Sequence, residues 1–204
     1  MIKGVKICGI SDITTLTHIL DHDFPPKFIG FICDYKKSKR YVSYERLKTL
    51  LNVDRKNTNF VSVLVNPENE VLERMKKLNF DFLQLYNVEP KKTKMIKKKY
   101  DIKIITALTI IDQNDVNEYK NYMGISDIFL FDGKGYEKSI GFDHKLLNSV
   151  PKSLNKMIAG NIKLDDIPKF NDKDIYVDLS GALENEDGKK DVNKIDRLLN
   201  LVNK

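Results

Sequence analysis

The run Phe60-Val61-Ser62-Val63-Leu64-Val65 is followed directly by Asn66-Pro67 and then by an amphipathic stretch that ends at Leu78. Six residues dominated by β-branched and aromatic side chains, bounded by Asn-Pro, predict a short buried strand. Apolar residues spaced three to four apart predict that the following stretch is a helix. A strand followed by a helix is the repeating unit of a parallel sheet.

The same unit recurs in both directions from this stretch. Further strands are predicted at residues 5–8, 28–33, 81–85, 102–107, 127–131, 156–159 and 175–179. Helices are predicted at 12–20 (capped by Ser11 or Asp12), 43–51, 66–78, 90–99, 114–122, 144–148 and 191–202, with a weaker helical turn at 164–170. Eight such units in 204 residues fit an α/β fold, a small (β/α)₈ TIM barrel of eight parallel strands with outer helices. An open doubly wound sheet is the alternative, because the number of strands does not prove closure. No linker or break in composition divides the chain, so one domain spanning residues 1–204 is expected.

The composition suits a globular protein with a sizeable core, since 41% of the residues are hydrophobic. No apolar run approaches the roughly 18 residues of a membrane span. The first residues lead straight into a predicted strand without a signal-peptide pattern, so we expect a cytoplasmic protein. Two cysteines are too few for a disulfide scaffold or a zinc site, and the three histidines share no ligand spacing, so no metal is expected.

The net charge of +6 raises the possibility of a nucleic-acid partner. Only five of the 35 basic residues are arginines, although base and phosphate recognition depends largely on arginine. The lysines are spread along predicted helices. We therefore expect a solvated Lys-rich surface and no nucleic-acid partner, with a mild attraction for anionic metabolites.

The carboxyl ends of the predicted strands carry the candidate site, as in other barrels of this kind. Polar or reactive residues follow the strands at Cys8, Cys33-Asp34, Gln84, Asp132, Gly160-Asn161 and Asp178 to Gly181. Each also has a structural interpretation: a buried core cysteine, an aspartate cap or a glycine turn. The glycine-bearing loops after the seventh and eighth strands are where this fold commonly holds a phosphate, which predicts a phosphorylated small-molecule ligand.

Several motifs in the same order resemble one family. Lys6-Ile7-Cys8-Gly9-Ile10 resembles the N-terminal KICG signature of phosphoribosylanthranilate isomerases of tryptophan biosynthesis. Further similar segments are Gly30-Phe31 with Ser38 to Val42, Val63 to Asn66, Gln84-Leu85, Leu130 to Asp132, Ala159 to Ile162, and Asp178 to Glu184 with Gly188 and Lys190-Asp191. The resemblance covers essentially the whole chain.

This resemblance implies a cofactor-free Amadori rearrangement of N-(5-phosphoribosyl)anthranilate to its aminoketose isomer. Cys8 would be the general base and Asp132 the general acid. A thiol can act as a base if Lys6 or Arg40 favours its thiolate form, and Asp132 needs a raised pKa to hold a proton. The family pattern implies the other substrate-binding residues: Arg40 for the anthranilate carboxylate, Gly160, Asn161, Ser180, Gly181 and Ala182 for the phosphate, and Asp178 for a hydroxyl or amine. A monomer or a homodimer is expected.

The chain departs from the family pattern in four places. Asn161 replaces a glycine, which asparagine can do because it tolerates left-handed backbone geometry. Gly181 lies one position away from the family's glycine. The segment Gln84-Leu85-Tyr86-Asn87 stands where the family has Gln-Leu-His-Gly, so Tyr86 replaces a histidine and Asn87 a glycine. The glycine-rich segment after the sixth strand is reduced to Lys138-Ser139-Ile140-Gly141, followed by Phe142-Asp143-His144.

Two other functions compete with the isomerase. A phosphosugar barrel with another reaction, such as an epimerase or an aldolase, would need inward histidines or a lysine at a strand end; Lys103 and Lys156 lie in strands. A non-enzymatic basic barrel that binds a polyanion is the second alternative. Cys33 could be mistaken for the base, but an inert thiol is the expected interpretation.

Overall fold

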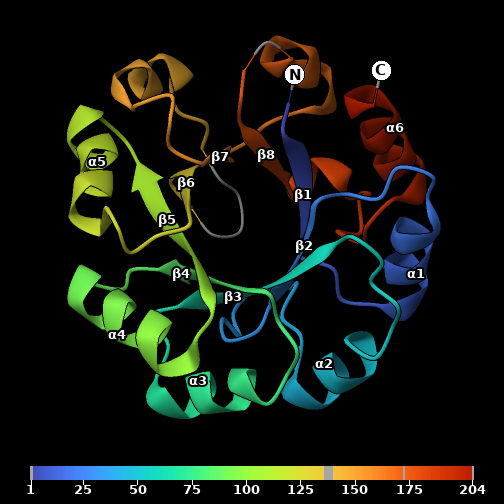
Figure 1. The fold of residues 1–204 in the computed structure, drawn as a ribbon. Coiled ribbons are helices and arrows are strands. Elements are labelled where there is room, and N and C mark those ends of the chain that lie inside the picture. Colours follow the sequence, from blue (N-terminus) through green and yellow to red (C-terminus); the bar gives the residue numbers. More distant parts are fainter. Residues whose placement is uncertain (1, 136–139, 172, 204) are drawn as a thin grey trace.

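A closed barrel of parallel strands forms the centre of the protein, and helices surround it (Figure 1). The structure is a computed structural model, and it describes residues 2–135, 140–171 and 173–203. The strands found in these residues are β1 (Gly4–Cys8), β2 (Phe28–Ile32), β3 (Asn59–Val65), β4 (Phe82–Tyr86), β5 (Lys103–Ile110), β6 (Ile128–Gly133), β7 (Lys156–Ile158) and β8 (Tyr176–Leu179). Each strand pairs with the next, and β1 also pairs with β8. This last pairing closes the barrel, so the prediction of a (β/α)₈ barrel is confirmed and the open sheet is wrong.

Helical segments connect the strands. The α-helices of the described residues are α1 (Ile13–Asp21), α2 (Tyr44–Leu50), α3 (Asn69–Lys76), α4 (Pro90–Tyr100), α5 (Gln113–Asn117) and α6 (Val192–Val202). The 3₁₀ segments are η1 (Glu118–Tyr122), η2 (His144–Ser149), η3 (Leu164–Phe170) and η4 (Gly181–Leu183). Side-chain caps fix several helix starts: the Asp12 carboxylate accepts from the Thr15 N–H at 2.8 Å, and Ser43 and Asp191 cap α2 and α6 in the same way.

Most predicted boundaries lie within a few residues of the observed ones, and three elements differ from the prediction. Helix α3 begins three residues later than predicted because Asn66 adopts a left-handed conformation with φ of 42°, which no helix continues. The single helix predicted at 114–122 is instead a short α-helix followed by η1. Strand β6 continues past Phe131, so Asp132 lies within the strand and pairs with Thr109 of β5.

Strict alternation along the strands separates two apolar clusters. In β1, Val5 and Ile7 join the outer cluster between the strands and the helices, whereas Cys8 joins the cluster inside the barrel. In β6, Phe129 and Phe131 face outward and Leu130 faces inward. Successive side chains of a strand point to opposite faces, so each residue's place in this alternation decides whether it lines the barrel interior.

An aromatic layer fills the barrel near the amino ends of its strands. Phe28 packs edge-to-face against Phe82 and Tyr176, with ring centroids 5.5 and 5.1 Å apart. These three residues begin β2, β4 and β8. The polar side chains of Gln84, Asp132 and Asp178 lie farther toward the carboxyl ends of their strands.

Candidate active site

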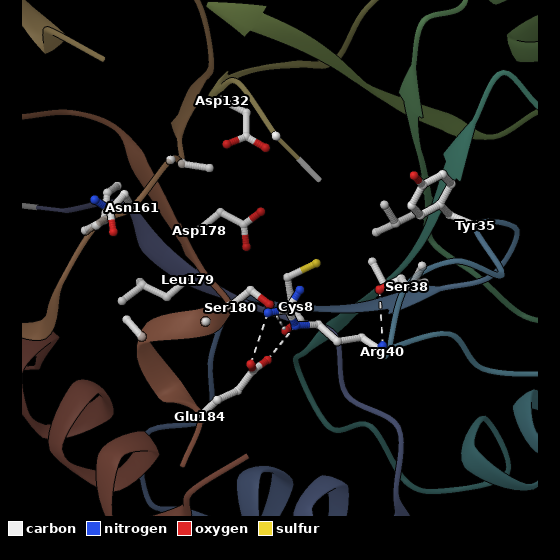
Figure 2. Close-up of a pocket in the computed structure, with 18 of the residues that line it drawn as sticks. Cys8, Tyr35, Ser38, Arg40, Asp132, Asn161, Asp178, Leu179, Ser180 and Glu184 are labelled. Atoms are coloured by element: carbon white, nitrogen blue, oxygen red, sulfur yellow. Dashed lines mark hydrogen bonds and ion pairs between the residues drawn. The ribbon is translucent and has the colours of Figure 1, made fainter. Parts of the chain in front are cut away.

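A pocket of about 560 Å³ opens at the carboxyl ends of the strands. A cavity of this size suits a small-molecule ligand. The pocket brings together every site residue predicted from the sequence: Cys8, Arg40, Asp132, Gly160, Asn161, Asp178, Ser180, Gly181 and Ala182. Figure 2 shows Cys8, Asp132 and Asp178 directed into this space from β1, β6 and β8.

Cys8 lies beside a buried ion pair. Lys6, two residues earlier on the same face of β1, is fully buried, and its Nζ donates to Asp178 Oδ2 at 2.8 Å. Burial raises the pKa of the Cys8 thiol, and the Lys6 cation offsets part of that rise. Because desolvation outweighs Lys6, the net effect favours the protonated thiol, and Lys6 only reduces the cost of forming the thiolate.

One carboxylate oxygen of Asp178 accepts a hydrogen bond from Lys6, and the other accepts none from the described residues. Its Oδ2 accepts from Lys6, whereas its Oδ1 is buried and accepts no hydrogen bond from any residue that the structure describes. An unsatisfied buried acceptor costs free energy until a donor reaches it. This oxygen is thus suited to accept a hydrogen bond from a ligand in the pocket.

Asp132 is held by a tyrosine from a different strand. The Tyr86 hydroxyl, at the end of β4, donates to Asp132 Oδ2 at 2.7 Å. Gln84, on the same face of β4, donates from Nε2 to the Tyr86 oxygen at 3.3 Å. Burial raises the pKa of Tyr86 well above its ordinary value, and the Asp132 charge adds to the rise, so this hydroxyl stays a donor.

The loop after β7 has the backbone geometry predicted for it. Gly160 has φ of 92° and Asn161 has φ of 54°, so asparagine does adopt the left-handed conformation where the family pattern has glycine. A Cβ at Gly160 would lie 2.6 Å from the Gly133 nitrogen, so no larger residue fits. In the described part of the chain the N–H groups of Gly160 and Asn161 donate to no backbone carbonyl, which leaves them available to an anion.

The loop after β8 is anchored to β1. Ser180 donates from its hydroxyl to the Cys8 carbonyl oxygen at 3.0 Å, and Lys190 Nζ donates to the Ser180 carbonyl at 2.9 Å. Gly181 has no left-handed φ, and a Cβ there would meet Arg40 Nη2 only at an ordinary 3.6 Å. The shifted glycine is therefore not demanded by the backbone at this position.

Arg40 lies in a cluster with one acidic and two further basic residues. Its Nη2 donates to Glu184 Oε2 at 3.0 Å and its Nε donates to Oε1. Lys190 and Lys39 reach the same carboxylate at 3.0 and 3.4 Å. Burial works against the charge of Glu184, but Arg40 and Lys190 hold its pKa at about 2. Three cations around one carboxylate leave this side of the pocket positively charged.

Gly9, which follows Cys8, leaves room for the Arg40 side chain. Gly9 has φ of 80°, and a Cβ there would lie 2.5 Å from Arg40 Cδ. The Arg40 side chain therefore passes directly over Gly9 on its way to Glu184. A left-handed backbone and a close approach both require glycine at this position.

The remaining candidates lie elsewhere. Cys33 belongs to the outer cluster, its thiol donates to the Phe31 carbonyl at 3.2 Å, and burial raises its pKa to about 12. Lys103 and Lys156 are the first residues of β5 and β7, at the end of the strands opposite to the pocket. Among the described residues no three His, Cys, Asp or Glu side chains come together as a metal site.

The segment after β6, where the chain departs from the family's glycine-rich pattern, lies partly outside the described residues. Lys138 and Ser139 are outside the described residues. Asp143 caps η2 by accepting from the Lys145 N–H at 3.0 Å, and His144 packs against Phe142 and Phe170. Asp143 and His144 therefore have structural contacts in this part of the chain.

A family model described as N-(5'-phosphoribosyl)anthranilate isomerase matches residues 5–201. This chain belongs to that family. An N-(5'-phosphoribosyl)anthranilate isomerase of Agrobacterium fabrum is 30% identical over 214 residues, covering 100% of the chain and 96% of the relative. One from Rhizobium rhizogenes is also 30% identical and covers 99% and 95%.

Solved structures of the isomerase family share the fold. The enzyme from Thermotoga maritima superimposes with a TM-score of 0.87 at 23% identity, covering 100% of this chain and 99% of that one. A phosphoribosylanthranilate isomerase in complex with reduced 1-(o-carboxyphenylamino)-1-deoxyribulose 5-phosphate gives 0.84 at 22% identity, with the same coverage. Within the described residues, no helix is long and apolar enough to cross a membrane.

The structure also reveals partners that the sequence did not. Lys6 and Asp178 are 172 positions apart, as are Ser180 and the Cys8 carbonyl. Glu184 was noted in the sequence only as part of a family motif, and the structure shows that its carboxylate accepts hydrogen bonds from Arg40. Tyr86, noted only as a missing histidine, contacts Asp132. Alternation along β4 was the available signal, because it places Gln84 and Tyr86 on the same inward face.

Proposed function

We propose that this chain isomerises N-(5'-phosphoribosyl)anthranilate to 1-(2-carboxyphenylamino)-1-deoxyribulose 5-phosphate, with Cys8 as general base and Asp132 as general acid. The observation that carries the proposal is the convergence of Cys8, Asp132 and the unsatisfied Oδ1 of Asp178 on one pocket. They come from three strands of a barrel whose family is named for this reaction.

The reaction needs one acid and one base. Asp132 delivers a proton to the ring oxygen, the furanose C1–O bond breaks, and the substrate nitrogen forms an iminium with C1. The Cys8 thiolate then takes the proton from C2, and the electrons of that C–H bond flow to the iminium nitrogen. The enolamine so formed tautomerises to the ketone, and atoms balance without a cofactor.

The electrostatics of the pocket support Cys8 in the base role. Its thiolate forms against the cost of burial, and Lys6 is the cation that offsets this cost. Each of the two proton-transfer roles contributes roughly 10²–10⁴ in rate. A base whose pKa is raised abstracts a proton more strongly once it is ionised.

The proposal assigns different residues to the two ends of the substrate, and Arg40 Nη2 lies next to Gly181 of the phosphate loop. Asn161 and Ser180 lie near Asp178, whereas Tyr35 and Ser38 lie across the pocket (Figure 2). Gly160, Asn161, Ser180, Gly181 and Ala182 hold the phosphate, and Arg40, oriented by Glu184, holds the anthranilate carboxylate. Asp178 Oδ1 accepts from a substrate hydroxyl or amine. The ligand is a phosphorylated small molecule, and a monomer or homodimer in the cytoplasm stays the expectation.

The competing functions receive less support. A Schiff-base reaction needs a lysine at the carboxyl end of a strand, but Lys103 and Lys156 begin their strands. Lys39 and Lys163 line the pocket but lie outside the strands. Lysines of α4 that would bind a polyanion are partly engaged, since Lys97 pairs with Asp127 at 2.8 Å and Lys99 with Glu73 at 2.7 Å.

The test is turnover of freshly generated phosphoribosylanthranilate by the wild type and by Asp132→Asn, with a chelator present. We expect the wild type to form the aminoketose and the variant to lose about 10²–10⁴ of kcat/KM. An inactive wild type would refute the function, whereas an active Asp132→Asn would refute only the assignment of the acid.

A further inference from the structure

Tyr86 reaches Asp132 across an intervening strand. β4 and β6 both pair with β5, and Ala107 of β5 lies opposite Tyr86 on one side and Leu130 on the other. Ala107 and Tyr86 both belong to the cluster inside the barrel. Because Ala107 contributes only a methyl group there, the phenol has room to extend over β5 to the carboxyl group of Asp132.

The direction of the hydrogen bonds follows from the donors. Gln84 Nε2 donates to the Tyr86 oxygen at 3.3 Å, so Tyr86 directs its own proton to Asp132 Oδ2 at 2.7 Å. Gln84 is 1% exposed and Tyr86 is 8% exposed, so water competes little for these bonds. The chain therefore runs from an amide through a phenol to one named oxygen of the carboxyl group.

The two oxygens of Asp132 have different surroundings. Oδ2 accepts from Tyr86, whereas Oδ1 lies beside the loop after β7, since a Cβ at Gly160 would lie 3.5 Å from Oδ1. That loop is the one assigned to the ligand in the proposed function. A protonated carboxyl group can accept at one oxygen and donate from the other.

We propose that Tyr86 is a positioning residue for Asp132: its hydroxyl holds Oδ2, so that Oδ1 carries the proton transferred to the ring oxygen. This inference rests on the proposed function, which makes Asp132 the acid. When Oδ1 releases its proton, the carboxylate gains its charge while Oδ2 keeps the hydrogen bond from Tyr86. Tyr86 retains its own proton throughout, so it takes no part in the proton balance.

The same hydrogen bond stabilises the charged form of Asp132 and so lowers its pKa relative to a variant without the donor. Among the described residues, the other titratable groups that act on Tyr86 beside Asp132 are Cys8 of β1 and Asp178 of β8, which is paired with Lys6. None of them is altered by replacing Tyr86 with phenylalanine. A shift caused by that replacement therefore reports on the hydroxyl.

The experiment compares Tyr86→Phe with Tyr122→Phe in the full chain. Tyr122 is a matched control because its hydroxyl donates at a similar 2.8 Å, to the Val88 carbonyl outside the barrel. Two readouts are used: the pH profile of kcat/KM, and the infrared titration of the Asp132 carboxyl band, which is assigned by its loss in Asp132→Asn. The infrared readout does not depend on turnover.

We expect Tyr86→Phe to raise the apparent pKa of Asp132 by about one unit in both readouts. Its kcat should fall about tenfold while KM stays within about twofold, because orientation and not substrate binding is lost. Tyr122→Phe should change neither. An unchanged or lowered Asp132 titration in a folded Tyr86→Phe would overturn the proposal.

Two further outcomes keep the test decisive. If Tyr86→Phe does not fold, Gln84→Met removes the donor to Tyr86 and should raise the Asp132 titration by a smaller amount; no change would overturn the proposal. If the wild type has no isomerase turnover, the proposed function fails, while the infrared titration still decides whether Tyr86 controls Asp132.

Discussion

The two cysteines lie on opposite sides of the barrel wall. Cys8 ends β1 and faces the interior, whereas Cys33 follows β2 and faces the layer between strands and helices. Both are 7% exposed, and burial raises the pKa of both thiols. They differ in their neighbours: Lys6 and Asp178 lie beside Cys8, while Cys33 donates to a backbone carbonyl among apolar side chains.

Burial alone therefore does not make a thiol a base. A desolvated thiol holds its proton, and only a nearby cation gives its thiolate a place to form. The barrel interior supplies that cation with a fixed counterion, and the outer layer does not. The following predictions test this difference between the interior and the outer layer.

The largest effect is expected where the interior ion pair is broken. Lys6→Met leaves the buried Asp178 carboxylate without its cation, so the free energy of unfolding should fall by about 3–5 kcal/mol in chemical denaturation. The double variant Lys6→Met/Asp178→Asn should recover most of this loss, because no buried charge remains. A loss below about 1 kcal/mol in the single variant would contradict the account.

Arg40→Ala should weaken substrate binding more than it slows chemistry. We expect a loss of about 2–4 kcal/mol in kcat/KM, mainly through KM, if Arg40 binds a desolvated carboxylate. Arg46→Ala, on the exposed face of α2, is the control and should behave as the wild type. A fall confined to kcat would contradict the binding role.

Acid should remove the contribution of Glu184. Its folded pKa of about 2 lies below the ordinary 4.5, so its stabilisation is complete above pH 4.5 and is lost as the pH falls toward 2. Glu184→Gln should therefore be less stable than the wild type at pH 7 and nearly equal to it at pH 2. The control Glu186→Gln, exposed in the same loop, should follow the wild type at every pH.

Thiol labelling of the folded protein should modify Cys8 and leave Cys33 unmodified. Cys8 lines the pocket, so iodoacetamide should modify it in the folded protein. Cys33 has a pKa of about 12 and lies in the outer layer, so it should react only after unfolding. Mass spectrometry of Cys8→Ala and Cys33→Ala checks this, and rapid labelling of Cys33 in the folded state would refute the distinction.

The order of the strands and helices could be predicted from the sequence, and so could the polar residues at the strand ends. Local patterns such as residues 60–65 predict strands because alternation and composition are local properties. Closure was not predictable in this way, because it depends on β1 meeting β8 across the whole chain. The contacts Lys6–Asp178 and Arg40–Glu184 likewise join residues that are 172 and 144 positions apart in the sequence.

Tyr86 shows a different limit of sequence reasoning. By comparison with a family pattern it is the loss of a histidine, but in the structure its hydroxyl contacts the proposed acid. Its contact depends on a small residue, Ala107, in the strand between them. Asn87, the next residue, also replaces a family glycine and adopts φ of 53°, as Asn161 does. These substitutions preserve backbone geometry, which a comparison of residue types does not reveal.

The most direct test of the central claim is isomerase turnover by the wild type, Cys8→Ala and Cys33→Ala under identical metal-free conditions. The account predicts that Cys8→Ala loses about 10²–10⁴ of kcat/KM while Cys33→Ala stays within about twofold of the wild type. Comparable activity of Cys8→Ala and the wild type, or an equal loss in Cys33→Ala, would contradict it.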